Sequence, residues 1–121
     1  ALPGAVTVMS GGTLCAPDDA ATLPHGIELK GAVTFEEGSA LTHAGIASRI
    51  ANNDAFFTVP LLLLAPGATL TDAELKDLPV AANLPKGWLA KAKQETVTVG
   101  GESRVAVSVD ITFAGMTVIV R

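Results

Sequence analysis

Residues 95–121 decide the fold, and they read ETVTV, GGES, RVAVSVDITF, AG and MTVIVR in that order. Within 104–113, apolar side chains alternate strictly with Arg, Ala, Ser, Asp and Thr. The apolar set is Val105, Val107, Val109, Ile111 and Phe113. A period of two is typical of a β-strand that buries one face and exposes the other. The alternation continues before this segment in Val97 and Val99, and after it in Met116, Val118 and Val120.

Turn residues separate this stretch and the rest of the chain into short strands. The Gly100-Gly101 pair lies between two alternating segments and predicts a hairpin turn. The other predicted strands are 5–9, 27–30, 32–35 and 56–64. Pro60 has no amide hydrogen, so the last strand is expected to bend or to lie at a sheet edge there. The remaining turn-rich segments are 13–26, 36–39, 65–68 and 85–91.

Two segments have the pattern of short helices. In 40–51, the side chains of Leu41, Ile46 and Ile50 fall on one helical face, with Ser39 or Thr42 as the cap. In 72–78, Thr71 and Glu74 have the spacing of a capping box. Pro79 is expected to end this second helix, because proline cannot continue the backbone hydrogen bonding.

Together these elements predict a mainly β fold. We expect a single-domain β-sandwich or small barrel with one or two short helices, at about 40–51 and 72–78. A chain of 121 residues has room for one hydrophobic core. Residues 1–4 are expected to form an extended N-terminal arm, and residues 5–121 a single β-rich domain.

The composition disfavours several classes of partner. Charged residues make up 17% of the chain, below the usual ~25%, so we expect another chain or small uncharged side chains to cover part of the surface. The net charge is −4 and the basic residues are scattered, which disfavours nucleic acid and anionic membranes as partners. The apolar run 59–66 is too short to span a bilayer, and the first twelve residues lack the features of a signal peptide.

Residues that could carry chemistry are few. His25 lies in a predicted turn and His43 on a predicted helix surface, and no metal-ligand spacing involves either of them. Cys15 is the only cysteine, and we interpret it as a small buried side chain, with an inter-chain disulfide as the alternative. Sets such as Ser10, Asp18 and His25, or Ser48, His43 and Asp54, lack a nucleophile motif.

The adjacent carboxylates Asp18-Asp19 and Glu36-Glu37 are expected in solvated turns, because neighbouring side chains point apart. With 4% aromatic residues, carbohydrate stacking sites, antibody-like binding surfaces and platforms for single-stranded nucleic acid are also disfavoured. We therefore predict a non-enzymatic protein with no cofactor, no metal and no small-molecule ligand. The alternative is a small enzyme whose site contains His25 or His43.

The predicted interface residues are large apolar side chains. Trp88 is either a partly buried anchor or an interface residue, since tryptophan is enriched in binding hot spots. One of the two adjacent phenylalanine rings is expected to face outward, because neighbours in a strand point to opposite faces. The predicted set is Leu2, Val6, Phe56, Phe57 and Trp88.

The segment 61–75, LLLLAPGATLTDAEL, resembles the strand, Pro-Gly turn and capped-helix units of tailed-phage head and tail-associated proteins. In its low charge and its Ala, Gly, Val and Thr content, the chain is similar to small virion proteins of the decoration or minor capsid type. The resemblance implies a virion protein, assembled in the host cytoplasm, that clamps a major capsid protein as a homo-oligomer, with a trimer favoured. The alternative is a bacterial surface or secreted β-sandwich adhesion module.

Overall fold

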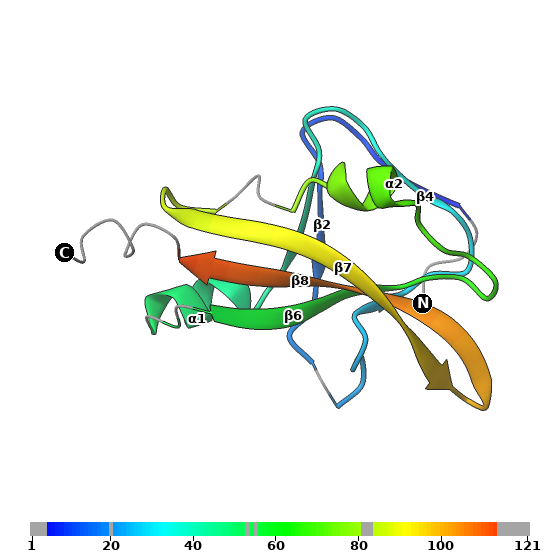
Figure 1. Ribbon diagram of the computed structural model, residues 1–121. Helices are drawn as coiled ribbons and strands as arrows, with labels where there is room; N and C mark the ends of the chain where they lie inside the picture. Colours follow the sequence, from blue (N-terminus) through cyan, green and yellow to red (C-terminus); the bar gives the residue numbers. More distant parts are fainter. Residues whose placement is uncertain (1–4, 20, 53, 55, 81–83, 114–121) are drawn as a thin grey trace.

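The central feature of the molecule is a four-stranded sheet with the strand order β3-β6-β8-β7. The computed structural model describes residues 5–19, 21–52, 54, 56–80 and 84–113 (Figure 1). The strands are β3 (Ile27–Glu28), β6 (Phe56–Leu63), β7 (Trp88–Val99) and β8 (Glu102–Phe113). The pair β3 and β6 is parallel, whereas β6 and β7 both run antiparallel to β8. The predicted hairpin at Gly100-Gly101 is confirmed, and both glycines have positive φ angles, as tight hairpin turns require.

Four short strands form two further parallel pairs. They are β1 (Val6–Val8) with β4 (Val33–Phe35), and β2 (Thr13–Ala16) with β5 (Ala40–His43). Among the described residues these sheets do not close on one another. The predicted mainly β single domain is thus confirmed, but its barrel alternative is not formed.

The core lies on one face of the four-stranded sheet, as the alternation in 104–113 predicts. Val107, Val109 and Ile111 are fully buried, and they pack with Phe57 and Val59 of the neighbouring strand. Each such side chain contributes about 1.5–3 kcal/mol when it leaves water. Further buried side chains from the smaller sheets, helix α1 (Ile46–Ala51) and the loops close this core, namely Leu29, Leu41, Ile46 and Val80.

Strand β6 carries the predicted irregularity at its proline. The pairing register with β8 shifts between Pro60 and Leu62, so Leu61 is the extra residue of a bulge. The backbone of Gly26 approaches this bulge so closely that a Cβ atom there would lie 2.3 Å from the carbonyl of Leu61. Gly26 also has a φ angle of 86°, which only glycine adopts without strain. Glycine is therefore required where this loop crosses the sheet.

The helix predicted at 40–51 is wrong in its first half. Residues Ala40–His43 form β5, which pairs with β2, and α1 covers only Ile46–Ala51. The apolar Leu41 satisfies both patterns, and the partner strand decides between them, because β2 and the carbonyl of Pro79 supply backbone hydrogen bonds. Helix α1 begins at Gly45 without a side-chain cap, so neither predicted cap residue is used.

Helix α2 (Asp72–Lys76) begins as predicted. The Glu74 amide donates to the Thr71 hydroxyl at 3.1 Å, and the Thr71 amide donates to the Glu74 carboxylate at 2.9 Å. The helix ends at a cap on Asp77, before the predicted end at 78.

Two strands extend into segments predicted to be turns. Strand β2 occupies 13–16, and β7 begins at Trp88 instead of after the predicted turn at 85–91. Both depend on partners distant in sequence, which short local patterns do not reveal. The predicted arm at 1–4 with Leu2, and the alternating Met116, Val118 and Val120, lie outside the described residues.

Candidate functional site

An exposed apolar pair lies at one end of the solvent-facing side of the four-stranded sheet. Phe56 of β6 and Leu89 of β7 are both paired with Thr112 of β8, one on each side. Side chains directly opposite each other in a sheet point to the same face. The exposed fractions are 64% for Phe56 and 57% for Leu89. The apolar pair is therefore an open surface that spans three strands.

Directly beneath this pair, the opposite face of the sheet carries an aromatic cluster. The Trp88 ring centroid lies 5.0 Å from that of Phe113 and 6.3 Å from that of Phe57. The Arg49 guanidinium of α1 lies 5.7 Å from the centroid of the Phe57 ring. Helix α1 lies at the end of the sheet where β7 begins and β8 ends, opposite the β7–β8 turn (Figure 1). The packed rings support the strands that display Phe56 and Leu89.

The predicted interface residues therefore occupy different environments. Phe56 faces solvent and Phe57 is 6% exposed in the core, as expected for neighbours in a strand. Trp88 is half-buried within the aromatic cluster, and Val6 is half-buried on β1. Sequence reasoning missed Leu89, because the strand that exposes it was predicted to be a turn. Phe56 and Leu89 thus form the most accessible apolar surface on the sheet.

Next to the apolar pair, the solvent-facing side becomes polar. Asp110 of β8 accepts a hydrogen bond from the Thr58 hydroxyl and forms an ion pair with Lys93 at 3.0 Å. The hydrogen bond from Thr58 and the contact with Lys93 lower the pKa of Asp110, against a smaller opposing effect of burial. The carboxylate is therefore ionised at neutral pH and gives this part of the sheet a stable charged network.

Arg104 holds the far end of the same face together. It was expected to face solvent, but it is 7% exposed and bonds through three nitrogens. Its Nε and Nη2 atoms donate to the Leu64 carbonyl, Nη2 also donates to Leu29, and Nη1 contacts the Glu28 carboxylate at 2.6 Å. The hydrogen bond from Arg104 lowers the pKa of Glu28. Arg104 thus links β3, β6 and β8, and its role is structural.

Beyond β6, the hairpin of β7 and β8 continues as a two-stranded ribbon. Strand β6 ends at Leu63, opposite Ala106, and the Leu64 amide still donates to the Val105 carbonyl, so the part of the hairpin without a strand beside it is 96–103. Figure 1 shows this tip projecting past the other strands at the lower right. Ribbon residues Thr96, Thr98, Glu102 and Ser103 are exposed. The ribbon is therefore a second accessible surface.

His43 is buried, which corrects its predicted place on a helix surface. It lies in β5 with 5% of its surface exposed, and its Nδ1 atom accepts a hydrogen bond from the Gly45 amide at 2.9 Å. Burial lowers its pKa, Arg49 lowers it further, and the nearby Asp18 opposes the shift. The imidazole is therefore neutral at pH 7.

The structure does not assemble a nucleophile next to this imidazole among the described hydrogen bonds. The Ser48 hydroxyl donates to the carbonyl of Gly45 at 3.1 Å, so both side chains bond to the backbone of one glycine. His25 lies in a turn, as predicted. Cys15 is exposed on β2, so its predicted burial is wrong. Among the described residues, no group of three His, Cys, Asp or Glu side chains is arranged to hold a metal ion.

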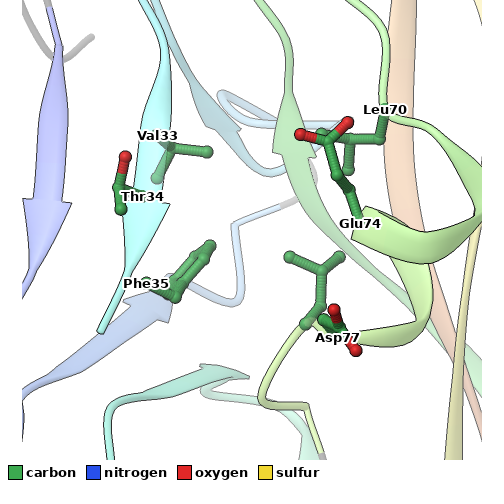
Figure 2. Close-up of a pocket in the computed structure, with 7 residues that line it drawn as sticks. Val33, Thr34, Phe35, Leu70, Glu74 and Asp77 are labelled. Carbon is green, nitrogen blue, oxygen red and sulfur yellow. The ribbon is translucent and has the colours of Figure 1, made fainter. Parts of the chain in front are cut away.

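A shallow hollow of about 250 Å³ lies between β4 and α2. Figure 2 shows Val33, Thr34 and Phe35 on one side, with Glu74 and Asp77 on the helix side. The Glu74 carboxylate is already bonded to the Thr71 amide in the capping box. Asp77 occupies the C-cap position of α2. The Glu74 carboxylate that lines this hollow therefore serves the N-terminal cap of α2.

Comparison with known proteins identifies no relative, since no family model, no curated protein and no solved structure matches this chain. Over the described ranges, the structure contains no helix long and apolar enough to cross a membrane.

Proposed function

We propose that this chain is a non-enzymatic structural protein that binds neighbouring protein subunits, as a decoration or clamp protein does on a viral shell. The observation that carries the proposal is the exposed pair Phe56 and Leu89 on a sheet face backed by packed aromatic rings. An aromatic ring on a rigid support is a common centre of a protein interface.

The apolar pair is strong enough to anchor such a contact. Complete burial of a Phe or Leu side chain contributes about 1.5–3 kcal/mol each. A stable interface covers about 800 Å² on each partner, so the charged network around Asp110 would form its polar rim. On a shell with many identical positions, even weak single contacts give strong attachment through avidity.

The composition and the resemblance support a protein subunit of a viral shell as the partner. Only 17% of residues are charged, which suits a surface that other subunits cover. The segment 61–75 forms the end of β6, a Pro-Gly turn and capped α2, the order of elements on which the resemblance to phage virion proteins rests. The proposed partner is therefore a major capsid protein.

The test is co-sedimentation of the purified chain with candidate capsid shells that lack their decoration subunits. We expect the unmodified chain to sediment with the shells, and Phe56→Ser with Leu89→Ser to weaken binding at least about tenfold. Met9→Ser is the matched control, because Met9 is 66% exposed but lies away from the sheet, after β1. If the double variant binds as tightly as the unmodified chain, the apolar pair is not the binding surface. If the unmodified chain sediments with none of the shells, the proposed function is refuted.

A further inference from the structure

Strand β7 is a long and regular edge strand. Its pairing with β8 runs without interruption from Trp88 opposite Phe113 to Val99 opposite Glu102. Its sequence contains no proline and its register contains no bulge. Among the described residues no strand pairs with its far edge. Long, regular edges of this kind are templates for another strand, and proteins normally interrupt or cover them.

We infer that β7 pairs antiparallel with β7 of a second copy, around a twofold axis at Gln94. This inference rests on the proposed function and specifies its contact between identical subunits. The two four-stranded sheets would then form one continuous sheet. The resulting assembly is a twofold pair, in place of the trimer that the resemblance implies.

The charge pattern of β7 selects this register. One face of β7 carries Leu89, Lys91, Lys93, Glu95, Val97 and Val99; the first four of these side chains are exposed and the two valines are half-buried. With Gln94 opposite itself, Lys93, whose amine also pairs with Asp110 of its own chain, faces Glu95 of the second copy, and this contact occurs twice. Leu89 then faces Val99, and Lys91 faces Val97.

Neighbouring registers are electrostatically less favourable, because each contains a like-charge contact at the axis. Residues that lie opposite each other in an antiparallel pair must point to the same face of the sheet. The twofold axis can therefore pass only through a residue, and it moves along β7 by whole residues. With the axis at Lys93, Lys91 faces Glu95 twice, but Lys93 faces its own copy; with the axis at Glu95, two glutamates face each other and no ion pair forms. The register centred on Gln94 forms two ion pairs without a like-charge contact. Like charges directly opposite each other destabilise a strand pair, whereas opposite charges stabilise it.

A groove lies beside the part of the edge along which the tip of the incoming strand would run. Between α2 and β7 lies a hollow of about 400 Å³ whose lining is mainly apolar, formed by Asp72, Leu75, Lys76, Leu78, Val80, Ala90, Lys91 and Ala92. In the inferred register, Thr96 and Thr98 of the second copy lie opposite Ala92 and Ala90. The projecting hairpin tip of each copy would therefore enter the groove of the other, in the manner of strand addition beside a helix.

Cysteine cross-linking tests the register directly. In a full-length Cys15→Ser background, we expect a mixture of Lys93→Cys and Glu95→Cys chains to form a disulfide dimer rapidly under mild oxidation. Each variant alone, and a mixture of Lys91→Cys with Glu95→Cys, should cross-link far more slowly because those positions are not opposite each other. Preferential cross-linking in the latter mixture would overturn the register.

Charge exchange tests the attraction without altering the apolar pair. By light scattering, Glu95→Lys should weaken self-association about tenfold, because two contacts change from attraction to repulsion. The exchange variant, Lys93→Glu with Glu95→Lys, should restore it in part, because the new carboxylate at position 93 also meets Asp110 of its own chain. A chain that remains a monomer at high micromolar concentration would overturn the pairing even if it still sediments with shells. A pair that forms but binds no shell would instead refute only the proposed capsid function.

Discussion

At the scale of single residues, His43 is the side chain whose environment most affects behaviour in solution. Its Nδ1 atom accepts from the Gly45 amide, so the neutral form is built into the corner between β5 and α1. Protonation of Nδ1 would remove this acceptor from a side chain that is only 5% exposed. Because this buried histidine is neutral, the folded state binds a proton more weakly than the unfolded chain does.

We therefore predict that stability falls as the pH is lowered through the histidine range. The pKa of His43 is lowered in the folded state from its ordinary value of 6.5. Between these two pKa values the unfolded chain holds more protons, so the free energy of unfolding rises with pH in that window and falls as the solution is acidified. Denaturant unfolding at several values between about pH 7 and pH 5 measures this slope.

The control for this prediction is His43→Asn, which keeps a side-chain acceptor close to the Nδ1 position but does not titrate. It should flatten the slope above about pH 5. The lowered pKa values of Glu28 and Asp110 act at lower pH, below their ordinary values of 4.5 and 3.8, where stability is also lost on acidification. An unchanged slope in His43→Asn would assign the pH dependence to other groups.

At the scale of elements, Arg104 joins three strands that are distant in sequence. The Leu64 and Leu29 carbonyls that it bonds lie just after β6 and β3. A carbonyl that loses its donor inside the protein costs about 1–3 kcal/mol. We predict that Arg104→Lys lowers the free energy of unfolding by about 2–4 kcal/mol, because a lysine amine cannot bond to both carbonyls and the carboxylate in this planar arrangement.

A comparison with Glu28→Gln separates the two parts of this network. That change removes the ion pair but leaves the bonds from Arg104 to the carbonyls, so it should cost less than Arg104→Lys. Urea unfolding of both variants makes the comparison. If Glu28→Gln were the more destabilising change, the ion pair and not the carbonyl bonds would hold the strands together.

The elements also show which features of the fold can be predicted from sequence. Strand β8 and the α2 capping box were predicted correctly, because each is encoded by contiguous residues with a local physical signature. Strand β5 was predicted as helix, since Leu41, Ile46 and Ile50 also fit a helical face. The deciding factor was its parallel pairing with β2, which has no local pattern of its own.

The candidate site was predictable only in part for the same reason. The exposure of one ring of the Phe56-Phe57 pair follows from alternation alone. Leu89 becomes part of the same surface only through its register opposite Thr112, which no neighbouring residue in the sequence indicates. Arg104 looks like any other polar residue of an alternating strand, and its buried position depends on loops after β3 and β6.

At the scale of the whole molecule, stability is distributed unevenly between the sheet centre and its projecting tip. Strand β8 is paired on both sides along most of its length, and its residues Val107, Val109 and Ile111 are fully buried. The tip around Gly100-Gly101 is paired only within itself and is exposed. Backbone amides at the tip exchange with solvent through local opening, whereas those at the centre exchange only when the whole domain unfolds.

We predict that native-state hydrogen exchange, followed residue by residue at low protein concentration, is slowest at these three β8 positions. Their protection should match the global free energy of unfolding, and Arg104→Lys should lower both by the same amount, whereas the amides of 98–103 should exchange with little change. If the tip were as protected as the centre in dilute monomer, it would already be ordered by contacts within one chain. The free ribbon would then be no reason to expect that β7 recruits a second copy.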